Sequence, residues 1–137
     1  MITACCVLFQ FCSKPPLPES EVKTVIYKWA GAIEKNDYRL YSKYELTPDD
    51  KDYYNEKYEN HYPKNFVFFK IDNPIEVDID NKVFIKTTVN FQCDLIPRKI
   101  GIVKKTMKGT MDIVRETNAD YRPYLIAEMT TITYDEK

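Results

Sequence analysis

The chain has 137 residues, a net charge of −1 at pH 7, and 44% hydrophobic against 30% charged residues. These values are typical of one soluble globular domain that buries its own core. Its lysines are spread among acids, so the sequence offers no basic stripe for nucleic acid. Its three glycines are too few and too scattered for a phosphate loop or a dinucleotide fingerprint, and we expect no cofactor.

Residues 1–12 carry no charge, and a proline-rich spacer follows at residues 13–18. The apolar run is shorter than the about 20 residues of a membrane-spanning helix and is typical of the apolar part of a secretory signal. Because it contains Cys5, Cys6 and Cys12, it resembles a bacterial lipoprotein signal. That resemblance implies a lipid on Cys5, which follows a fitting small-residue pattern, or on Cys12, and the spacer favours Cys12. We therefore expect an envelope protein held to the membrane only by a lipid, with a cytoplasmic protein as the alternative.

Apolar residues recur at helical spacing from residue 19 to about residue 60. One face of the first predicted helix carries Val22, Val25, Ile26, Trp29 and Ile33. Asn36 and Asp37 are predicted to end this helix, and Asp37 to cap a second, shorter one.

The segment Thr47-Pro48-Asp49-Asp50 predicts the start of a third helix, with a capping hydroxyl followed by a proline in the first turn. This helix is predicted to run to about Asn60. A stripe of Tyr54, Tyr58 and Tyr62 at i, i+4 spacing is typical of packing.

From residue 66 to residue 134 the apolar residues alternate as in strands. Odd-numbered residues from Ile85 to Ile113 are predicted to meet the helices in a dry interior, and Gly109 is expected to mark a bend or bulge. In the last strand, Leu125, Ala127 and Met129 are predicted to share one face. Residues 19–137 thus predict a single α+β domain with three N-terminal helices on the concave face of a curved antiparallel sheet.

The segments WAGAIEKND (residues 29–37) and YRPYLI (residues 121–126) resemble the opening and the ending of nuclear transport factor 2-like domains. The resemblance covers residues 19–135 and implies a cone-like sheet whose concave side is filled by helices. A cystatin-like or another helix-on-sheet fold is the alternative. Catalytic members of that superfamily place a carboxylate or histidine, with a tyrosine or second acid, inside the cone.

No acid or histidine interrupts the predicted inward positions, and His61, the single histidine, has no evident partner. Without a Cys-x-x-Cys pair, a metal site is not expected. This pattern favours a non-enzymatic binding or assembly module for a small apolar ligand or a protein, such as a second copy of the chain. The alternatives are an isomerase- or dehydratase-like enzyme that uses a pocket acid or His61, and a cytosolic protein-interaction domain. Candidate pocket-lining residues are Trp29, Tyr41, Tyr54, Tyr58, Phe91, Met107, Met111 and Tyr124.

Overall fold

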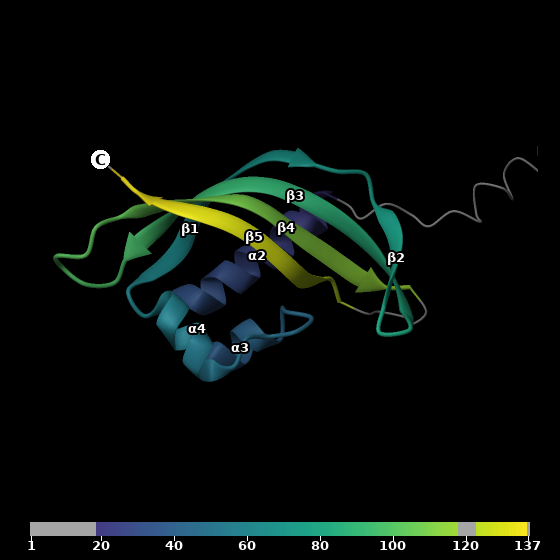
Figure 1. The fold of residues 1–137 in the computed structure, drawn as a ribbon, viewed down its shortest axis with the longest axis horizontal. Coiled ribbons are helices and arrows are strands. Elements are labelled where there is room, and N and C mark those ends of the chain that lie inside the picture. Colours follow the sequence, from purple (N-terminus) through teal and green to yellow (C-terminus); the bar gives the residue numbers. More distant parts are fainter. Residues whose placement is uncertain (1–18, 118–122, 137) are drawn as a thin grey trace, which may run out of the picture.

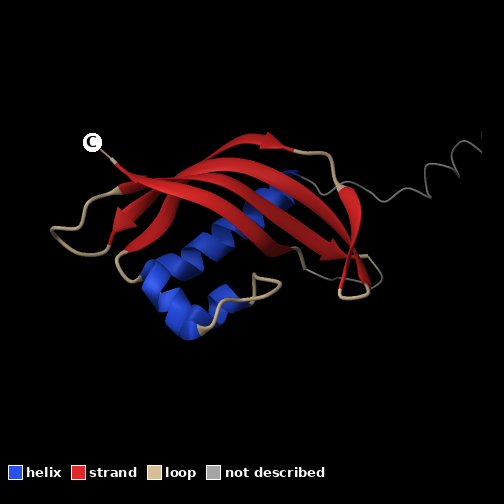
Figure 2. Cartoon of the chain, viewed as in Figure 1, coloured by secondary structure: helices blue, strands red, loops and turns tan. Residues whose placement is uncertain are grey.

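The computed structural model describes residues 19–117 and 123–136, so Cys12 lies outside the described residues. Within these ranges, the chain forms helices first and strands afterwards (Figures 1 and 2). The helices are α2 (Glu19–Glu34), α3 (Tyr38–Ser42) and α4 (Lys51–Tyr58). The strands are β1 (His61–Ile71), β2 (Ile75–Ile79), β3 (Lys82–Pro97), β4 (Lys105–Glu116) and β5 (Leu125–Asp135). The α+β prediction with an antiparallel sheet is confirmed.

The five strands form one curved sheet with the helices on one side of it (Figure 1). The order is β1-β3-β4-β5. The strand β2 lies off this path and pairs with the first residues of β3, 82–86, whereas β1 pairs with the later residues 89–97. All of these pairings are antiparallel. The long β3 pairs with β1, β2 and β4, and β5 is attached through β4.

The face predicted for the first helix is the buried face of α2. The chain leaves the helix at Asn36, whose φ of 55° lies in the left-handed region that asparagine tolerates. Asp37 then caps α3, because its carboxylate accepts a hydrogen bond from the backbone N–H of Leu40 at 3.0 Å. Both predictions for this corner are confirmed.

The third helix begins later than predicted. Asp50, not Thr47, is the N-cap of α4, and its carboxylate accepts a hydrogen bond from the N–H of Tyr53 at 2.9 Å. The helix ends at Tyr58, and the sheet begins at His61 rather than residue 66. Pro63 is tolerated inside β1 because β1 lies at the edge of the sheet, where a missing N–H need not break the ladder. The tyrosine stripe therefore ends within α4.

The predicted inward register of β3 and β4 is confirmed: its odd-numbered members, from Ile85 through Phe91 to Ile113, are buried against the helices. The register of β5 was wrong at its start. A shift between Asp112 and Ile113 pairs Ile113 with Ile126, so Ile126 rather than Leu125 enters the core. This bulge adds one residue to β5, so the side chains before it point to the opposite face from the one that regular alternation predicts.

Gly109 marks a close approach rather than the bulge itself. A Cβ atom at this position would lie 2.1 Å from the carbonyl oxygen of Thr130 on the neighbouring strand. The backbones of β4 and β5 can therefore meet here only without a side chain.

Candidate functional site

The predicted pocket residues form the interior of the domain. All but Tyr124 are buried in the hydrophobic core: Trp29, Tyr41, Tyr54, Tyr58, Phe91, Met107 and Met111. The rings of Tyr41 and Tyr54 lie 4.6 Å apart between centroids, and those of Tyr54 and Tyr58 lie 5.4 Å apart. Tyr124 is half-buried at the margin of this core and lines a surface pocket.

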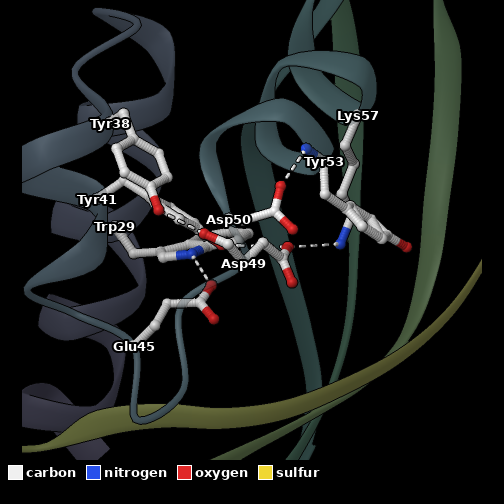
Figure 3. Close-up of polar contacts among 8 residues, drawn as sticks. All are labelled: Trp29, Tyr38, Tyr41, Glu45, Asp49, Asp50, Tyr53 and Lys57. Carbon is white, nitrogen blue, oxygen red and sulfur yellow. Dashed lines mark hydrogen bonds and ion pairs between the residues drawn. The ribbon is translucent and has the colours of Figure 1, made fainter.

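A half-buried carboxylate lies beside these aromatic rings, supplied by Glu45 from the segment between α3 and α4 (Figure 3). The indole Nε1 of Trp29 donates a hydrogen bond to Glu45 Oε2 at 2.7 Å. The Tyr41 hydroxyl donates to Asp49 Oδ2 at 3.3 Å, and the Tyr38 hydroxyl donates to the Asp49 carbonyl oxygen at 2.6 Å. Lys57 Nζ lies 4.0 Å from Asp49 Oδ2. Glu45 and Asp49, four residues apart in the sequence, thus accept hydrogen bonds from different rings: Glu45 accepts from Trp29, and Asp49 accepts from Tyr38 and Tyr41.

The backbone of β5 holds Glu45 in place. The N–H of Leu46 donates to the carbonyl oxygen of Ile126, and the N–H of Ile126 donates to that of Tyr44, each at 2.8 Å. These two bonds form an isolated parallel bridge between Glu45 and Ile126. Successive side chains of an extended segment point to opposite sides. Glu45 therefore contacts Trp29, while the neighbouring Tyr44 points away from it.

Burial raises the pKa of Glu45, because desolvation disfavours the charged carboxylate. Hydrogen bonds from Trp29 and Tyr41 oppose this effect, and the charge of Asp49 adds to it. Burial also raises the pKa of Tyr58 well above its ordinary value. Glu45 can therefore keep a proton at a higher pH than a solvated glutamate does.

The alternation of the strands did not point to Glu45, because this residue lies outside them, between α3 and α4. The segment between α3 and α4 has no periodicity, so no face could be assigned to its side chains. One signal was present: a buried tryptophan needs an acceptor for its N–H, and Glu45 is the first acid after α3 in the sequence.

A pocket of about 440 Å³ opens between the first turns of α2, the end of α3 and the residues before β5. Its lining residues are Glu21, Thr24, Val25, Lys28, Lys43, Tyr44, Pro123 and Tyr124. Tyr124 is the one predicted pocket-lining candidate among these residues.

Two cations and one acid line this pocket. Lys28 and Lys43 form no ion pair with any residue in 19–117 or 123–136. Burial and a hydrogen bond with Glu21 raise the pKa of Tyr124, so its hydroxyl stays protonated. Arg115 Nη1 lies 3.4 Å from this hydroxyl, and its guanidinium lies 5.4 Å from the ring centroid. The polar groups of the pocket are therefore predominantly positive.

His61, the alternative catalytic candidate, lies at the start of β1. Its Nε2 is 2.7 Å from the carbonyl oxygen of Val103, in the connection between β3 and β4. Among the described residues, no group of histidine, cysteine and acid side chains could hold a metal ion. Within residues 19–117 and 123–136 no helix combines the length and the apolar character needed to cross a bilayer.

The described residues include the whole of the first segment that resembles nuclear transport factor 2-like domains, at residues 29–37. Of the second segment, residues 121 and 122 lie outside the described part of the chain. No protein-family model, curated protein or solved structure was found to match this chain.

Proposed function

We propose that this protein is a non-enzymatic binding module whose ligand is a small apolar molecule with an anionic group. The observation that carries this proposal is the 440 Å³ pocket, which combines aromatic and aliphatic walls with two lysines that lack acidic partners among the described residues. Ligand pockets are usually apolar clefts of this size with a few polar groups that orient the ligand.

The apolar part of the ligand would lie against Val25, Tyr44 and Tyr124. Val25 belongs to the buried face of α2, while Tyr44 and Tyr124 pack against the core from the rim. These side chains are held by elements on both sides of the pocket, α2 and the segment that is bonded to β5. Such a wall needs little rearrangement to bind an apolar group, which lowers the entropic cost of binding.

The anionic group would lie near Lys28 and Lys43. An acidic ligand gives both ammonium groups a partner, whereas an uncharged ligand gives them none. Glu21 on the same wall disfavours a ligand that is negative along its whole length, so one anionic end on an apolar body fits best.

The frame of this module would be the nuclear transport factor 2-like cone that the sequence resembles, with the helices on the concave side of the sheet. The curvature of the sheet and the shared core of helices and strands support this assignment. We further propose that a lipid on Cys12 holds the domain at a cell envelope, because an uncharged segment with three cysteines precedes a proline-rich spacer. Metabolic labelling with a palmitate analogue tests the anchor: labelling that survives Cys12→Ser would refute it.

A second candidate function, proton transfer of the isomerase or dehydratase kind, is favoured by the raised pKa of Glu45 beside Tyr41. Glu45 is not among the residues that line the 440 Å³ pocket, and Trp29 already occupies its Oε2. A base-sensitive probe such as 5-nitrobenzisoxazole tests this candidate. A rate that depends on Glu45, and is lost in Glu45→Gln, would favour the enzyme over the binding module.

Calorimetric titration tests the proposed ligand class. Decanoate should bind, and decanol, which has the same chain without the charge, should bind less well. The double variant Lys28→Ala/Lys43→Ala should weaken decanoate binding about fivefold, because exposed charge pairs contribute up to about 1 kcal/mol. Lys108→Ala removes an exposed lysine of β4 and serves as the control. Equal affinity for both probes would remove the anionic group from the proposal, and no binding of either would refute the pocket as a ligand site.

A further inference from the structure

The strand β5 forms one edge of the sheet (Figure 1). Its inner edge pairs with β4, and no other strand of the described residues pairs with its outer edge. Within residues 19–117 and 123–136, backbone hydrogen bonds reach the outer edge at Ile126, which is bonded to Tyr44 and Leu46. The free part of the edge therefore begins after Ile126.

The direction of the backbone groups along this free part follows from the ladder between β4 and β5. The N–H of Glu136 donates to the carbonyl oxygen of Lys104, so the even-numbered residues at this end of β5 bond to β4. The register has no shift from residue 128 to residue 135, so the backbone groups alternate between the two edges. Four residues thus direct their N–H and carbonyl groups outward, away from every described strand: Met129, Thr131, Thr133 and Asp135.

The other edge of the sheet carries features that hinder pairing with a further strand. β1 contains Pro63 and two register shifts, one of which spans Asn65 with its φ of 58°. β2 has only five residues. Natural sheets use short edge strands, prolines and bulges in this way to prevent association through their edges. Residues 129–134 of β5, with the sequence MTTITY, contain no proline, glycine or charge, so the edge of β5 lacks this protection.

An exposed apolar side chain lies at the centre of the unprotected edge. Ile132 is 66% exposed, more than any other large hydrophobic residue of the described strands. It lies beside Lys108, on the face of the sheet opposite to the helices, and the exposed Tyr134 shares that face. Ile132 is also the midpoint of residues 129–135. The exposed apolar surface of β5 is thus centred on the free part of its edge.

We propose that this edge pairs with the same edge of a second copy of the chain, antiparallel and about a twofold axis at Ile132. In this register Thr131 of one copy lies opposite Thr133 of the other. Met129 likewise lies opposite Asp135, so all four outward residues form backbone hydrogen bonds. Centring the pair one residue earlier or later would leave one of the four without an outward partner. The free edge is therefore used in full in one register only.

The side chains along the edge favour a second copy over a strand of another protein. The two Ile132 side chains meet at the axis, where the Cα atoms of a non-hydrogen-bonded pair are about 4.5 Å apart, so each covers the other. With no charge in residues 129–134, the edge has no electrostatic means of selecting a foreign strand. The one like-charge pair, Glu128 opposite Glu136, lies beyond the last hydrogen bond. Lys104 already pairs with Glu136 at 3.3 Å, which weakens that repulsion.

Sedimentation velocity of the full chain tests the association. The wild type should sediment with the mass of a dimer. Ile132→Lys would place two ammonium groups at the axis and should halve the mass, and the fold should be unchanged because this side chain is exposed. Phe69→Lys is the matched control, since it makes the same replacement at an exposed position of β1, and it should stay a dimer. A monomeric wild type would overturn the proposal and leave the edge to a strand of another protein. A dimer that survives Ile132→Lys would overturn it as well.

Disulfide trapping tests the register, in a background in which Cys5, Cys6 and Cys12 are replaced by serine. Ile132→Cys should cross-link two chains on mild oxidation, because disulfides join Cα atoms about 4.4–6.8 Å apart. Thr130→Cys is exposed on the same face, but its two copies would lie four residues apart along the pair, about 14 Å, and should not cross-link. Cross-linking of Thr130→Cys that is as fast as that of Ile132→Cys would overturn the proposed pairing.

Discussion

Trp29 donates its indole N–H to the carboxylate of Glu45 over 2.7 Å, and this contact joins α2 to the segment between α3 and α4. The same segment is bonded to β5 through Tyr44, Leu46 and Ile126. Because Tyr44 lines the 440 Å³ pocket, the position of the pocket wall depends on two anchors, one on a helix and one on the sheet.

The stability of the domain should depend on pH through Glu45. Its pKa in the folded chain is raised above the ordinary 4.5, so the unfolded chain loses this proton first as the pH rises. The Glu45 contribution to the free energy of unfolding is therefore fully present below 4.5 and is lost as the pH rises through the folded-state pKa. Glu45→Gln keeps an acceptor for Trp29 without the charge, so the variant should gain stability relative to the wild type over this window. Urea unfolding at a series of pH values measures the difference, and a difference that shrinks with rising pH would contradict the assignment.

Removal of the Arg98 side chain should destabilise the domain by about 3 kcal/mol, because hydrogen bonds from a charged donor are worth about 1.5–3 kcal/mol. Its guanidinium closes the end of α2 through Ile33 and Glu34 and reaches Tyr58 at the end of α4. Chemical denaturation of Arg98→Ala measures the loss. The neighbouring Lys99 is exposed, so Lys99→Ala is the control and should unfold like the wild type.

Two glycine-to-alanine substitutions should have opposite effects. Gly109→Ala would place a methyl group 2.1 Å from the carbonyl oxygen of Thr130, and forcing these backbones apart should cost about 3 kcal/mol. Gly31 lies in α2 with nothing within 4 Å of the new atom, so Gly31→Ala should stabilise the domain by about 0.5–1 kcal/mol. Denaturation midpoints of the two variants test the pair, and a stable Gly109→Ala would contradict the described contact between β4 and β5.

Cys93 should react with a thiol reagent only when the domain unfolds. Burial, with the charge of Asp94 as the second cause, raises the pKa of Cys93 to about 12, and its side chain is buried in the core. The reactive thiolate is therefore scarce and shielded at neutral pH. Alkylation of a variant in which Cys5, Cys6 and Cys12 are replaced by serine isolates this thiol. Modification that is fast in buffer and no faster in urea would contradict the burial of Cys93.

Much of the fold could be predicted from local patterns. The buried face of α2 and the inward residues of β3 follow from regular spacing, and the cap at Asp37 follows from residue chemistry. The start of β5 could not be predicted, because the bulge opposite Asp112 and Ile113 depends on the partner strand rather than on β5 itself. The choice of Asp50 over Thr47 as the cap of α4 likewise depends on where Tyr38 and Tyr41 hold Asp49.

The candidate sites were harder to predict than the fold. The aromatic candidates were predicted to line a pocket. In the structure Trp29, Tyr41, Tyr54, Tyr58 and Phe91 belong to the hydrophobic core, and Tyr124 packs against that core while partly buried. The pocket residues Lys28, Lys43 and Tyr44 come together only because the segment after α3 is bonded to β5. A contact between residues about 80 positions apart leaves no periodic trace in either segment.

The most direct test of the binding module is the map of chemical-shift changes that decanoate produces in the ¹⁵N-labelled protein. We expect the largest changes at the amides of Val25, Lys28 and Tyr44, and their loss in Thr24→Trp, whose new side chain would fill the pocket from its exposed side. Changes spread evenly over the surface, or changes that persist in Thr24→Trp, would contradict the proposed ligand site.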